Sequence, residues 1–337
     1  MSQPDSGAEA AVDRRAVEAQ PGAAQQVSAA QLAQHVVAVT GATGFLGSHI
    51  ALELRRAGAS VRAAVRSPSK GQWLTERGVE LHRADLNDVA ALTQAFTGCT
   101  AVVANAALGS NQGSLEELVR GNTDGVRNTL SAAAQAGVGR VVYISSVAVY
   151  QNRVLRWQAE DSPLFDTDAV ASGKRTRGVS DLTTDWRYAH SKALAEALAW
   201  SEAARLSLQL TSLRPGPVYG SRDTKLMPRL LRRLRGPLLP VPSVGLPFVH
   251  AADVALGVVG ALSSPASVGE AYNVCGPPEA LSRVLSDLVA LRGRGPRVLS
   301  IPLPLWVGFD TRKAERDLGF RARNLSAGLR EALELDA

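Results

Sequence analysis

The sequence predicts an α/β fold: a doubly wound parallel sheet followed by a smaller C-terminal lobe. Three observations support this prediction. The short β-branched run His35–Val39 leads through three glycines into a helical pattern at Ser48–Leu54. Strand and helix patterns then alternate, and such alternation places helices on both faces of a parallel sheet. Beyond Pro215 the chain becomes richer in proline and glycine and its expected elements become shorter, which marks the second lobe.

The composition fits a globular protein. The chain has 337 residues, enough to bury a large core, and 45% of them are hydrophobic. It contains no apolar run of the roughly 18 residues that a membrane-spanning helix needs, and no secretion signal at its N-terminus. We therefore expect a cytoplasmic protein without a membrane partner. Cys99 and Cys275 lack a CxxC spacing, so we expect two buried thiols, and no metal site is predicted.

The net charge of +6 is modest for this length, and part of the excess lies in residues 228–235. Arginines and leucines of this segment separate onto two faces at helical spacing, as in a helix with one solvated face. A contact with an anion or a substrate is the alternative. Nucleic-acid binding is not expected, because no aromatic residues are interleaved with the arginines.

The elements are expected in the following order. Residues 1–33 are rich in Ala, Gln and Ser and offer no apolar face to bury, so they predict a mobile N-terminal extension. The strands expected after the first are 60–65, 79–84, 101–104, 140–145 and 208–213. The expected helices after the first are 88–97, 115–136 and 186–205. The polar segment 151–180 interrupts the alternation, and a loop of this length is typical of a lid, a binding loop or a disordered insert.

The turn after the first strand carries a functional signal. A strand that turns directly into a helix leaves the first N–H groups of the helix unpaired, and these donors, with the helix dipole, form a site for a phosphate group. Gly41 can adopt the positive φ of a tight turn, Gly44 lets the backbone approach a pyrophosphate, and Gly47 lets the helix pack on its strand. This pattern predicts dinucleotide binding in a Rossmann-type fold.

Three residues are candidates for the chemistry. Ser146 follows the fifth expected strand, at the carboxyl edge where open α/β sheets bind ligands. Tyr188 and Lys192 are four positions apart in one expected helix, so their side chains share a face. A neighbouring ammonium and a cationic nicotinamide lower the pKa of a phenol, which lets Tyr188 act as an acid or base while Ser146 holds the substrate oxygen. Taken singly, each residue also fits a structural role.

From residue 35 onward, these motifs make the chain resemble the extended short-chain dehydrogenase/reductase family, which includes nucleotide-sugar epimerases, dihydroflavonol reductases and 3β-hydroxysteroid dehydrogenases. The matching segments are Thr40–Gly47, Ala84–Leu86, Ala106–Ala107, Asn122–Asn128, Ser145–Tyr150, Tyr188 with Lys192, Leu213–Gly220, Phe248–Val254 and Tyr272–Val274. The resemblance implies a catalytic triad of Ser146, Tyr188 and Lys192, in which Lys192 also holds the nicotinamide ribose. It implies cofactor contacts from Gly41, Thr43, Gly44, Phe45, Leu46, Gly47, Asp85, Leu86, Ala106, Asn122, Tyr188, Lys192 and Pro215.

The same resemblance implies a domain organisation. Residues 34–214 are expected to form the dinucleotide-binding domain, and residues 215–337 mainly a substrate-binding lobe, from which residues 250–275 return to the first domain. Ser146 and Tyr188 are 42 positions apart, more than the family usually shows, and the insert at 151–185 is expected to shape or cover the substrate pocket. Asp85 and Leu86 would border the adenine, and His250 would hold the two lobes together rather than react.

Cofactor choice depends on the end of the second strand, where NAD-preferring folds place an acid that bonds the ribose 2′-hydroxyl. The residue at this position is Arg66, and no acid lies within Val61–Lys70. An arginine suits a 2′-phosphate by its charge and by stacking on adenine. NADP(H) is therefore favoured over NAD(H).

The sequence favours an NAD(P)(H)-dependent oxidoreductase that interconverts a carbonyl and a secondary alcohol by hydride transfer. Nucleotide-sugar epimerases and dehydratases tend to carry an arginine four residues before the histidine of the Val249–His250 motif, and this chain has Leu246 there. The apolar run Pro237–Pro242 also fits a less charged small molecule, such as a ketone or a sterol-like ring. A nucleotide-sugar epimerase or dehydratase is the alternative, and a non-catalytic cofactor-binding regulator or scaffold is the third hypothesis. The family resemblance suggests a homodimer.

Overall fold

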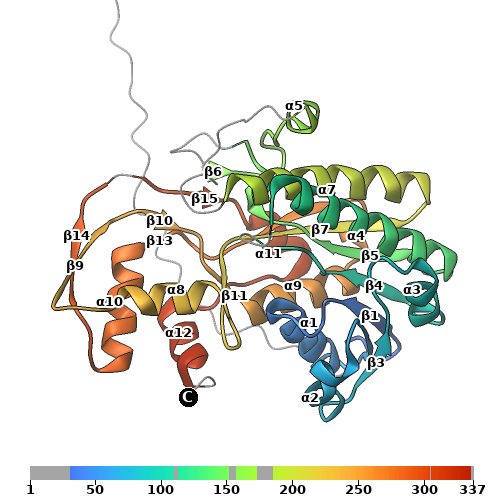
Figure 1. The fold of residues 1–337 in the computed structure, drawn as a ribbon, viewed down its shortest axis with the longest axis horizontal. Helices are drawn as coiled ribbons and strands as arrows, with labels where there is room; N and C mark the ends of the chain where they lie inside the picture. The colour runs from blue at the N-terminus through green and yellow to red at the C-terminus, as the bar shows by residue number, and fades with distance from the viewer. Residues whose placement is uncertain (1–30, 110–112, 152–156, 173–184, 304, 335–337) are drawn as a thin grey trace, which may run out of the picture.

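A seven-stranded parallel sheet forms the centre of the computed structural model, which describes residues 31–109, 113–151, 157–172, 185–303 and 305–334. The strand order is β12-β7-β5-β4-β1-β2-β3 (Figure 1). The strands are β1 (Val36–Thr40), β2 (Ser60–Val65), β3 (Val79–Arg83), β4 (Ala101–Ala104), β5 (Arg140–Ile144), β7 (Gln209–Pro215) and β12 (Ala271–Val274). Each neighbouring pair is parallel, which confirms the predicted doubly wound sheet.

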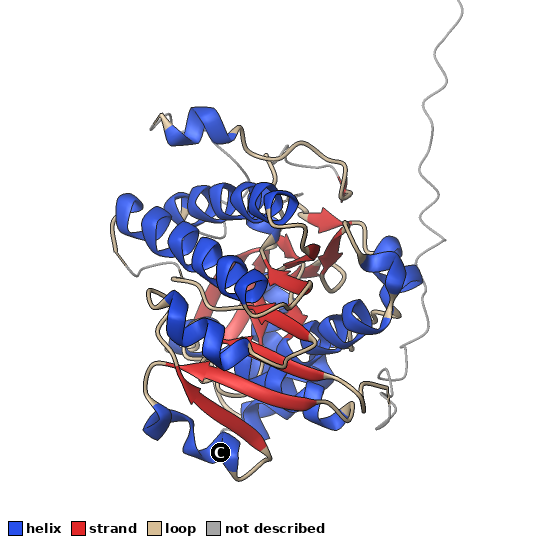
Figure 2. Cartoon of the chain, turned by 90° about the vertical axis from the view of Figure 1, so that its right-hand side faces the viewer, coloured by secondary structure: helices blue, strands red, loops and turns tan. Residues whose placement is uncertain are grey.

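Helices cover both faces of this sheet, and Figure 2 shows it lying between the helical layers. The larger helices are α1 (Phe45–Arg56), α3 (Val89–Phe96), α4 (Leu115–Gln135), α7 (Trp186–Arg205), α9 (Ala251–Ser263) and α11 (Arg312–Leu318). One apolar core lies between the sheet and α1, α9 and α11, and a second lies between the sheet and α3, α4 and α7 (Figure 1). The order of the strands reverses between β1 and β4, and ligands bind at the carboxyl ends of strands at such a point.

Apart from α1, which begins at Phe45 and not at Ser48, the expected strands and helices agree with the observed ones to within about two residues, because each has a clear local signal. The strands are apolar, β-branched runs. Ser114 and Glu117 form a capping box at the start of α4, and the carboxylates of Asp88 and Asp185 cap α3 and α7. The strand β12 was not among the expected strands.

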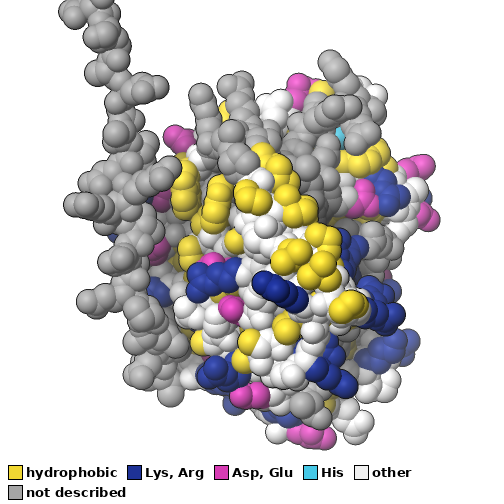
Figure 3. All heavy atoms as spheres, turned by 90° about the vertical axis from the view of Figure 1, so that its left-hand side faces the viewer, with side chains coloured by type: hydrophobic (Ala, Val, Ile, Leu, Met, Phe, Trp, Pro, Cys, Tyr) yellow, Lys and Arg dark blue, Asp and Glu magenta, His cyan; other side chains and the backbone are white. Residues whose placement is uncertain are grey.

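The C-terminal lobe packs around a core of its own. Its elements are α8 (Leu226–Arg233), β9 (Leu238–Pro242), β10 (Gly245–Leu246), β13 (Glu279–Ala280), α10 (Leu281–Arg292), β14 (Arg297–Ile301) and α12 (Leu325–Glu334). The strands β9 and β14 pair in parallel and pack on α10. Leu238, Leu299 and Ile301 remain exposed, and Figure 3 shows apolar side chains gathered on this side of the molecule. The apolar run Pro237–Pro242 thus belongs to the packing and the outer surface of the lobe.

The described chain also contains several short elements. They are α2 (Gln72–Thr75), β6 (Trp157–Gln158), α5 (Thr167–Ala171), β8 (Val218–Tyr219), β11 (Val249–His250) and β15 (Gly308–Phe309). In the described part of the chain, 3₁₀ turns occupy Pro68–Gly71, Val147–Val149 and Pro265–Ser267. Within the expected insert 151–180, β6 pairs with β15 and α5 packs on α7, while residues 152–156 and 173–180 lie outside the described residues.

Residues 1–30, most of the expected N-terminal extension, also lie outside the described residues. The chain is already packed at Leu32, whose side chain is buried in the core beside α1 and whose N–H donates to Ala57 O. Gln31 reaches Ser263 at the end of α9 with a side-chain hydrogen bond. Gln31 and Leu32, which belong to the range expected to be mobile, therefore pack against the rest of the chain.

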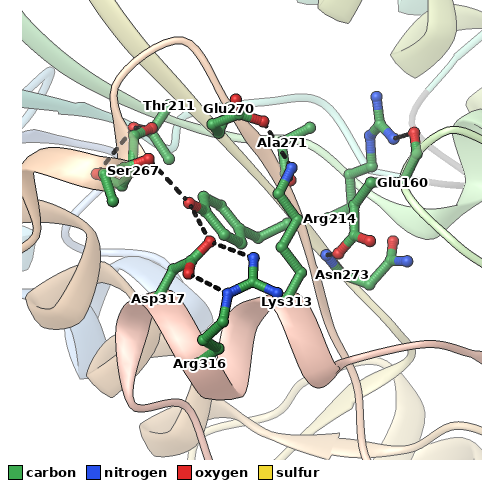
Figure 4. Close-up of polar contacts among 12 residues, drawn as sticks. Glu160, Thr211, Arg214, Ser267, Glu270, Ala271, Asn273, Lys313, Arg316 and Asp317 are labelled. Carbon is green, nitrogen blue, oxygen red and sulfur yellow. Dashed lines mark hydrogen bonds and ion pairs between the residues drawn. The ribbon is translucent and has the colours of Figure 1, made fainter.

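A buried polar network ties the sheet, α7 and the segment from Tyr150 to Glu160 together. Arg214 of β7 forms an ion pair with Glu196 of α7, and their side chains are 4% and 1% exposed. The Arg214 guanidinium also donates to Tyr150 Oη (2.8 Å), and this hydroxyl donates to Asn273 Oδ1 of β12 (2.7 Å). The backbone N–H of Asn273 in turn donates to the Glu160 carboxylate (2.8 Å), and Figure 4 shows Glu160, Arg214 and Asn273 together. Every charge in the network therefore has partners, as burial demands.

We predict that Arg214→Leu lowers the free energy of unfolding by about 3–5 kcal/mol, because it leaves the Glu196 carboxylate buried without its cation. Denaturant unfolding followed by circular dichroism measures the loss. Arg312→Leu is the matched control: it breaks an ion pair with Asp310, but the Arg312 side chain is 85% exposed, so the loss should stay below about 1 kcal/mol. Equal, small losses in both variants would contradict the structural role of the network.

Candidate active site

The glycine-rich turn between β1 and α1 has the geometry of a phosphate site. Gly41 has a φ of +69°, which is unfavourable for other residues. A Cβ on Gly47 would lie 2.2 Å from Gly41 O, so only glycine fits there. Gly44 precedes α1 and caps it without a side-chain hydrogen bond. The first N–H groups of α1, which begin at Phe45 and Leu46, thus lack a side-chain cap and can bind an anion.

The loop after β4 forms the other wall of this turn. The Thr40 hydroxyl accepts hydrogen bonds from the backbone N–H groups of Asn105 and Ala106, both at 3.1 Å. A Cβ on Gly41 would lie 3.0 Å from the Cα of Ala106. The ends of β1 and β4 therefore touch, and Thr43, in the turn itself, lies against Gly71 at the start of α2.

The predicted adenine and 2′-phosphate residues follow β2 and β3 at the same edge. Arg66 is exposed directly after β2. The Asp85 carboxylate accepts from the backbone N–H of Asn87 (2.9 Å), and the carbonyl of Leu86 accepts from the side-chain amide of Asn128 (2.8 Å). An open hollow of about 440 Å³ adjoins these residues, and its lining includes Asn87, Leu108, Gly121 and Asp124.

The side chain of Asn122, a predicted cofactor contact, forms hydrogen bonds with other protein groups in this structure. Its side-chain oxygen accepts from Leu108 N (2.6 Å), and its amide donates to Leu108 O (3.2 Å) and to Ser191 Oγ (2.9 Å). The side chain is buried. It therefore braces the loop after β4 against α7. Pro215 ends β7 beside Val274.

The structure brings Ser146 and Tyr188 together despite their separation in sequence. Ser146 lies just past β5, where its Oγ accepts from Ala148 N (3.1 Å), and Tyr188 packs against the turn Val147–Val149 that follows it. Burial raises the pKa of Tyr188 to about 12, against the opposing effect of the nearby Ser146 hydroxyl. The phenol therefore keeps its proton at neutral pH.

Lys192 lies one turn further along α7 and is held by β5. Its Nζ donates to Tyr143 Oη (3.1 Å) and to Ile144 O (2.8 Å). Burial lowers the pKa of Lys192 to about 8, and the Glu196 carboxylate opposes this shift. The contacts that hold the ammonium thus come from β5, whereas Tyr188 packs against the turn that follows Ser146.

Two buried residues near this site were not among the predicted site residues. Tyr143 holds Lys192, and Glu196 accepts hydrogen bonds from Ser145 Oγ and from the Arg214 guanidinium. Glu196 follows Lys192 by four positions, so the helical spacing that united Tyr188 and Lys192 also places this acid on their face. Nothing comparable in the sequence singles out Tyr143.

His250 makes contacts between lobes. Its Nδ1 accepts from the backbone N–H of Ala252 (3.3 Å), and its ring packs edge-on against Tyr219 of β8 and His49 of α1. Burial lowers the pKa of His250 to about 3, so the imidazole is neutral. This arrangement suits a packing role.

The residues at this edge fit a nicotinamide dinucleotide. The uncapped start of α1 and the cradle formed by Gly41, Gly47 and Ala106 suit a pyrophosphate. The described residues contain no group of three or more His, Cys, Asp and Glu side chains that could hold a metal ion. In the same part of the chain, no helix is both long and apolar enough to span a membrane.

Known proteins identify the family. Residues 37–275 match the model of the NAD dependent epimerase/dehydratase family. Cinnamoyl-CoA reductase 2 of Arabidopsis thaliana is 32% identical over 251 residues, which are 69% of this chain and 71% of that protein. Dihydroflavonol 4-reductase of Dianthus caryophyllus is 29% identical over 248 residues, which are 69% of this chain and 67% of that protein.

Solved structures share the fold. MoeE5 in complex with UDP-glucose and NAD is 28% identical, with a TM-score of 0.67 over 89% of this chain and 97% of that one. The crystal structure of gox2253 has a TM-score of 0.74 over 89% of this chain and 97% of that one, at 24% identity. The chain therefore belongs to the NAD dependent epimerase/dehydratase family, which confirms both the resemblance to extended short-chain dehydrogenases/reductases and the prediction of an NAD(P)-dependent oxidoreductase.

Proposed function

We propose that the protein is an NADP(H)-dependent reductase of a carbonyl compound, with Tyr188 as the acid. The observation that carries this proposal is that Tyr188, at the start of α7, packs against the turn Val147–Val149 directly after Ser146, at the edge where the glycine-rich turn also lies. Bound NADPH would supply a hydride to the carbonyl carbon. Tyr188 gives its proton to the carbonyl oxygen, so that a secondary alcohol and oxidised cofactor result.

The three side chains have separate tasks in this proposal. The Ser146 hydroxyl donates a hydrogen bond to the substrate oxygen and so positions it beside the phenol. Because burial keeps the Tyr188 hydroxyl protonated, this residue is ready to act as an acid. The Lys192 ammonium stabilises the phenolate that remains after proton transfer, and its unused N–H can bind a ribose hydroxyl.

The relatives support the reductive direction. Cinnamoyl-CoA reductase and dihydroflavonol 4-reductase are both reductases by name, and each aligns with about two thirds of this chain. The presence of Ser146, Tyr188 and Lys192 together argues against a non-catalytic regulator or scaffold. A cytoplasmic location belongs to the proposal and is supported by two cysteines, Cys99 and Cys275, that are buried free thiols. A homodimer remains an expectation from the family resemblance.

An epimerase or dehydratase acting on a nucleotide sugar is the second candidate, because MoeE5 was solved with UDP-glucose and NAD. The position where such enzymes tend to carry an arginine holds Leu246 of β10. This residue pairs with Glu279 of β13, so an apolar side chain and a carboxylate stand where a diphosphate needs a cation. We therefore favour an uncharged ketone as the substrate class.

We predict that Tyr188→Phe lowers kcat for NADPH-dependent ketone reduction at least about 10²-fold, because the proton donor is lost. The dissociation constant for NADPH should change less than about threefold, since the ring and its packing remain. Stopped-flow or steady-state kinetics and fluorescence titration measure the two quantities. A variant that keeps wild-type turnover would exclude Tyr188 as the acid.

The pH profile provides a second prediction. Burial disfavours the charged ammonium, so Lys192 loses its proton as the pH rises through about 8. The kcat/KM of reduction should be constant at lower pH and fall through this range, because neutral Lys192 no longer stabilises the Tyr188 phenolate. Initial rates at saturating NADPH give the profile. A constant rate up to about the ordinary lysine pKa of 10.4 would contradict this role.

Arg66 tests the cofactor preference. We predict that Arg66→Ala weakens NADPH binding about tenfold, the equivalent of about 1.4 kcal/mol for one exposed charge-assisted contact, and leaves NADH binding nearly unchanged. Arg62→Ala is the control, because Arg62 lies on β2, which Arg66 follows, but donates to Glu80 and Thr97 O. Equal losses for both cofactors would show that Arg66 does not bind the 2′-phosphate.

A further inference from the structure

Lys192 has an unusual partner. Its ammonium donates to the phenol oxygen of Tyr143 (3.1 Å) and lies 4.8 Å from the centroid of the same ring. Tyr143 belongs to β5, three residues before Ser146, and is 2% exposed. The second acceptor is the backbone carbonyl of Ile144 (2.8 Å), the last residue of β5. One phenol thus contributes both a hydrogen bond and a ring face to the lysine.

We propose that Tyr143 is a positioning residue for catalysis, whose hydroxyl and ring hold the Lys192 ammonium so that one N–H remains for the ribose of the cofactor. The inference rests on the proposed function. An ammonium has three N–H donors, and Tyr143 and Ile144 take two of them. A free lysine side chain would sample many rotamers, whereas two fixed acceptors on one strand select a single position.

The hydroxyl of Tyr143 is the part that matters, because the ring alone would provide no acceptor. Burial raises the pKa of Tyr143 well above its ordinary value, with a smaller contribution from Glu196, so the hydroxyl stays neutral and can accept from the lysine. The other ionisable groups around Lys192 are Glu196, which is paired with Arg214, and Tyr188. The Glu196 carboxylate favours the charged form of Lys192, and the same carboxylate forms an ion pair with Arg214.

The loss of the hydroxyl would therefore act through Lys192. One N–H of the buried ammonium would lose its acceptor, which disfavours the charged form and lowers the pKa of Lys192 further below about 8. The lysine would also be free to leave the position from which it contacts the ribose. Both effects follow from the loss of this hydroxyl: the cofactor binds more weakly, and activity is lost at a lower pH.

The variant Tyr143→Phe tests this inference, because it removes only the hydroxyl. Fluorescence titration with NADPH should give a dissociation constant about tenfold higher at a pH near 8, the effect of one hydrogen bond to a charged group. The alkaline limb of kcat/KM should move to lower pH by about one unit. An unchanged dissociation constant and an unchanged limb would overturn the proposal.

Tyr272→Phe is the matched control. Tyr272 is also fully buried, donates its hydroxyl hydrogen to Asp317, and lies under Lys313, whose Nζ is 4.9 Å from the ring centroid. It therefore reproduces the loss of a buried phenol hydroxyl beside a lysine, away from the catalytic residues. Its NADPH binding and pH limb should equal those of the wild type, and an equal effect in both variants would indicate a general loss of stability and contradict the proposal.

A double-variant comparison separates positioning from packing. In a Lys192→Met background, Tyr143→Phe should change the NADPH dissociation constant less than about twofold, because its target is already absent. A full tenfold effect in that background would show that Tyr143 acts independently of Lys192 and would overturn the inference. These binding measurements do not depend on turnover. If the proposed reduction mechanism is wrong, the Tyr188→Phe variant will remain active, and that result is independent of the binding measurements.

Discussion

The buried ion pair between Arg214 and Glu196 is the interaction on which the arrangement of the site depends. Glu196 lies on α7 one turn after Lys192, and its carboxylate also accepts from the hydroxyl of Ser145, the neighbour of Ser146. Burial of two charges costs free energy, and this cost is offset only where further hydrogen bonds satisfy the remaining atoms. Such a pair therefore permits few alternative positions of α7 on β5 and β7.

The consequence for chemistry is a fixed relation between the phenol, the ammonium and the serine hydroxyl. Ser145 N donates to Leu213 O (2.7 Å), which continues the pairing of β5 and β7 to the point where Ser146 begins. The same edge holds the glycine-rich turn two strands away. The positions of the candidate catalytic side chains relative to the glycine-rich turn thus follow from sheet register and from one buried network.

Local patterns in the sequence predicted most of the fold and the principal candidates. The strand before Gly41, the helix after it and the i, i+4 pair Tyr188 and Lys192 each depend on residues close in the chain. The position of β12 at the sheet edge depends on pairing with β7, 59 positions earlier, and the contacts of Asn273 with Tyr150 and Glu160 join residues more than a hundred positions apart. No spacing rule reveals such pairs. The phenol of Tyr143 is equally invisible, because an aromatic residue in a buried strand is ordinarily a packing residue.

The most direct test of the central claim is to follow the hydride. The protein is incubated with an uncharged ketone and NADPH that carries deuterium at the transferring position of the nicotinamide. We expect consumption of one NADPH for each alcohol formed, with the deuterium on the carbinol carbon of the product, and loss of this reaction in Tyr188→Phe. Turnover of a nucleotide sugar without net consumption of cofactor, and no deuterium in any alcohol, would contradict the account.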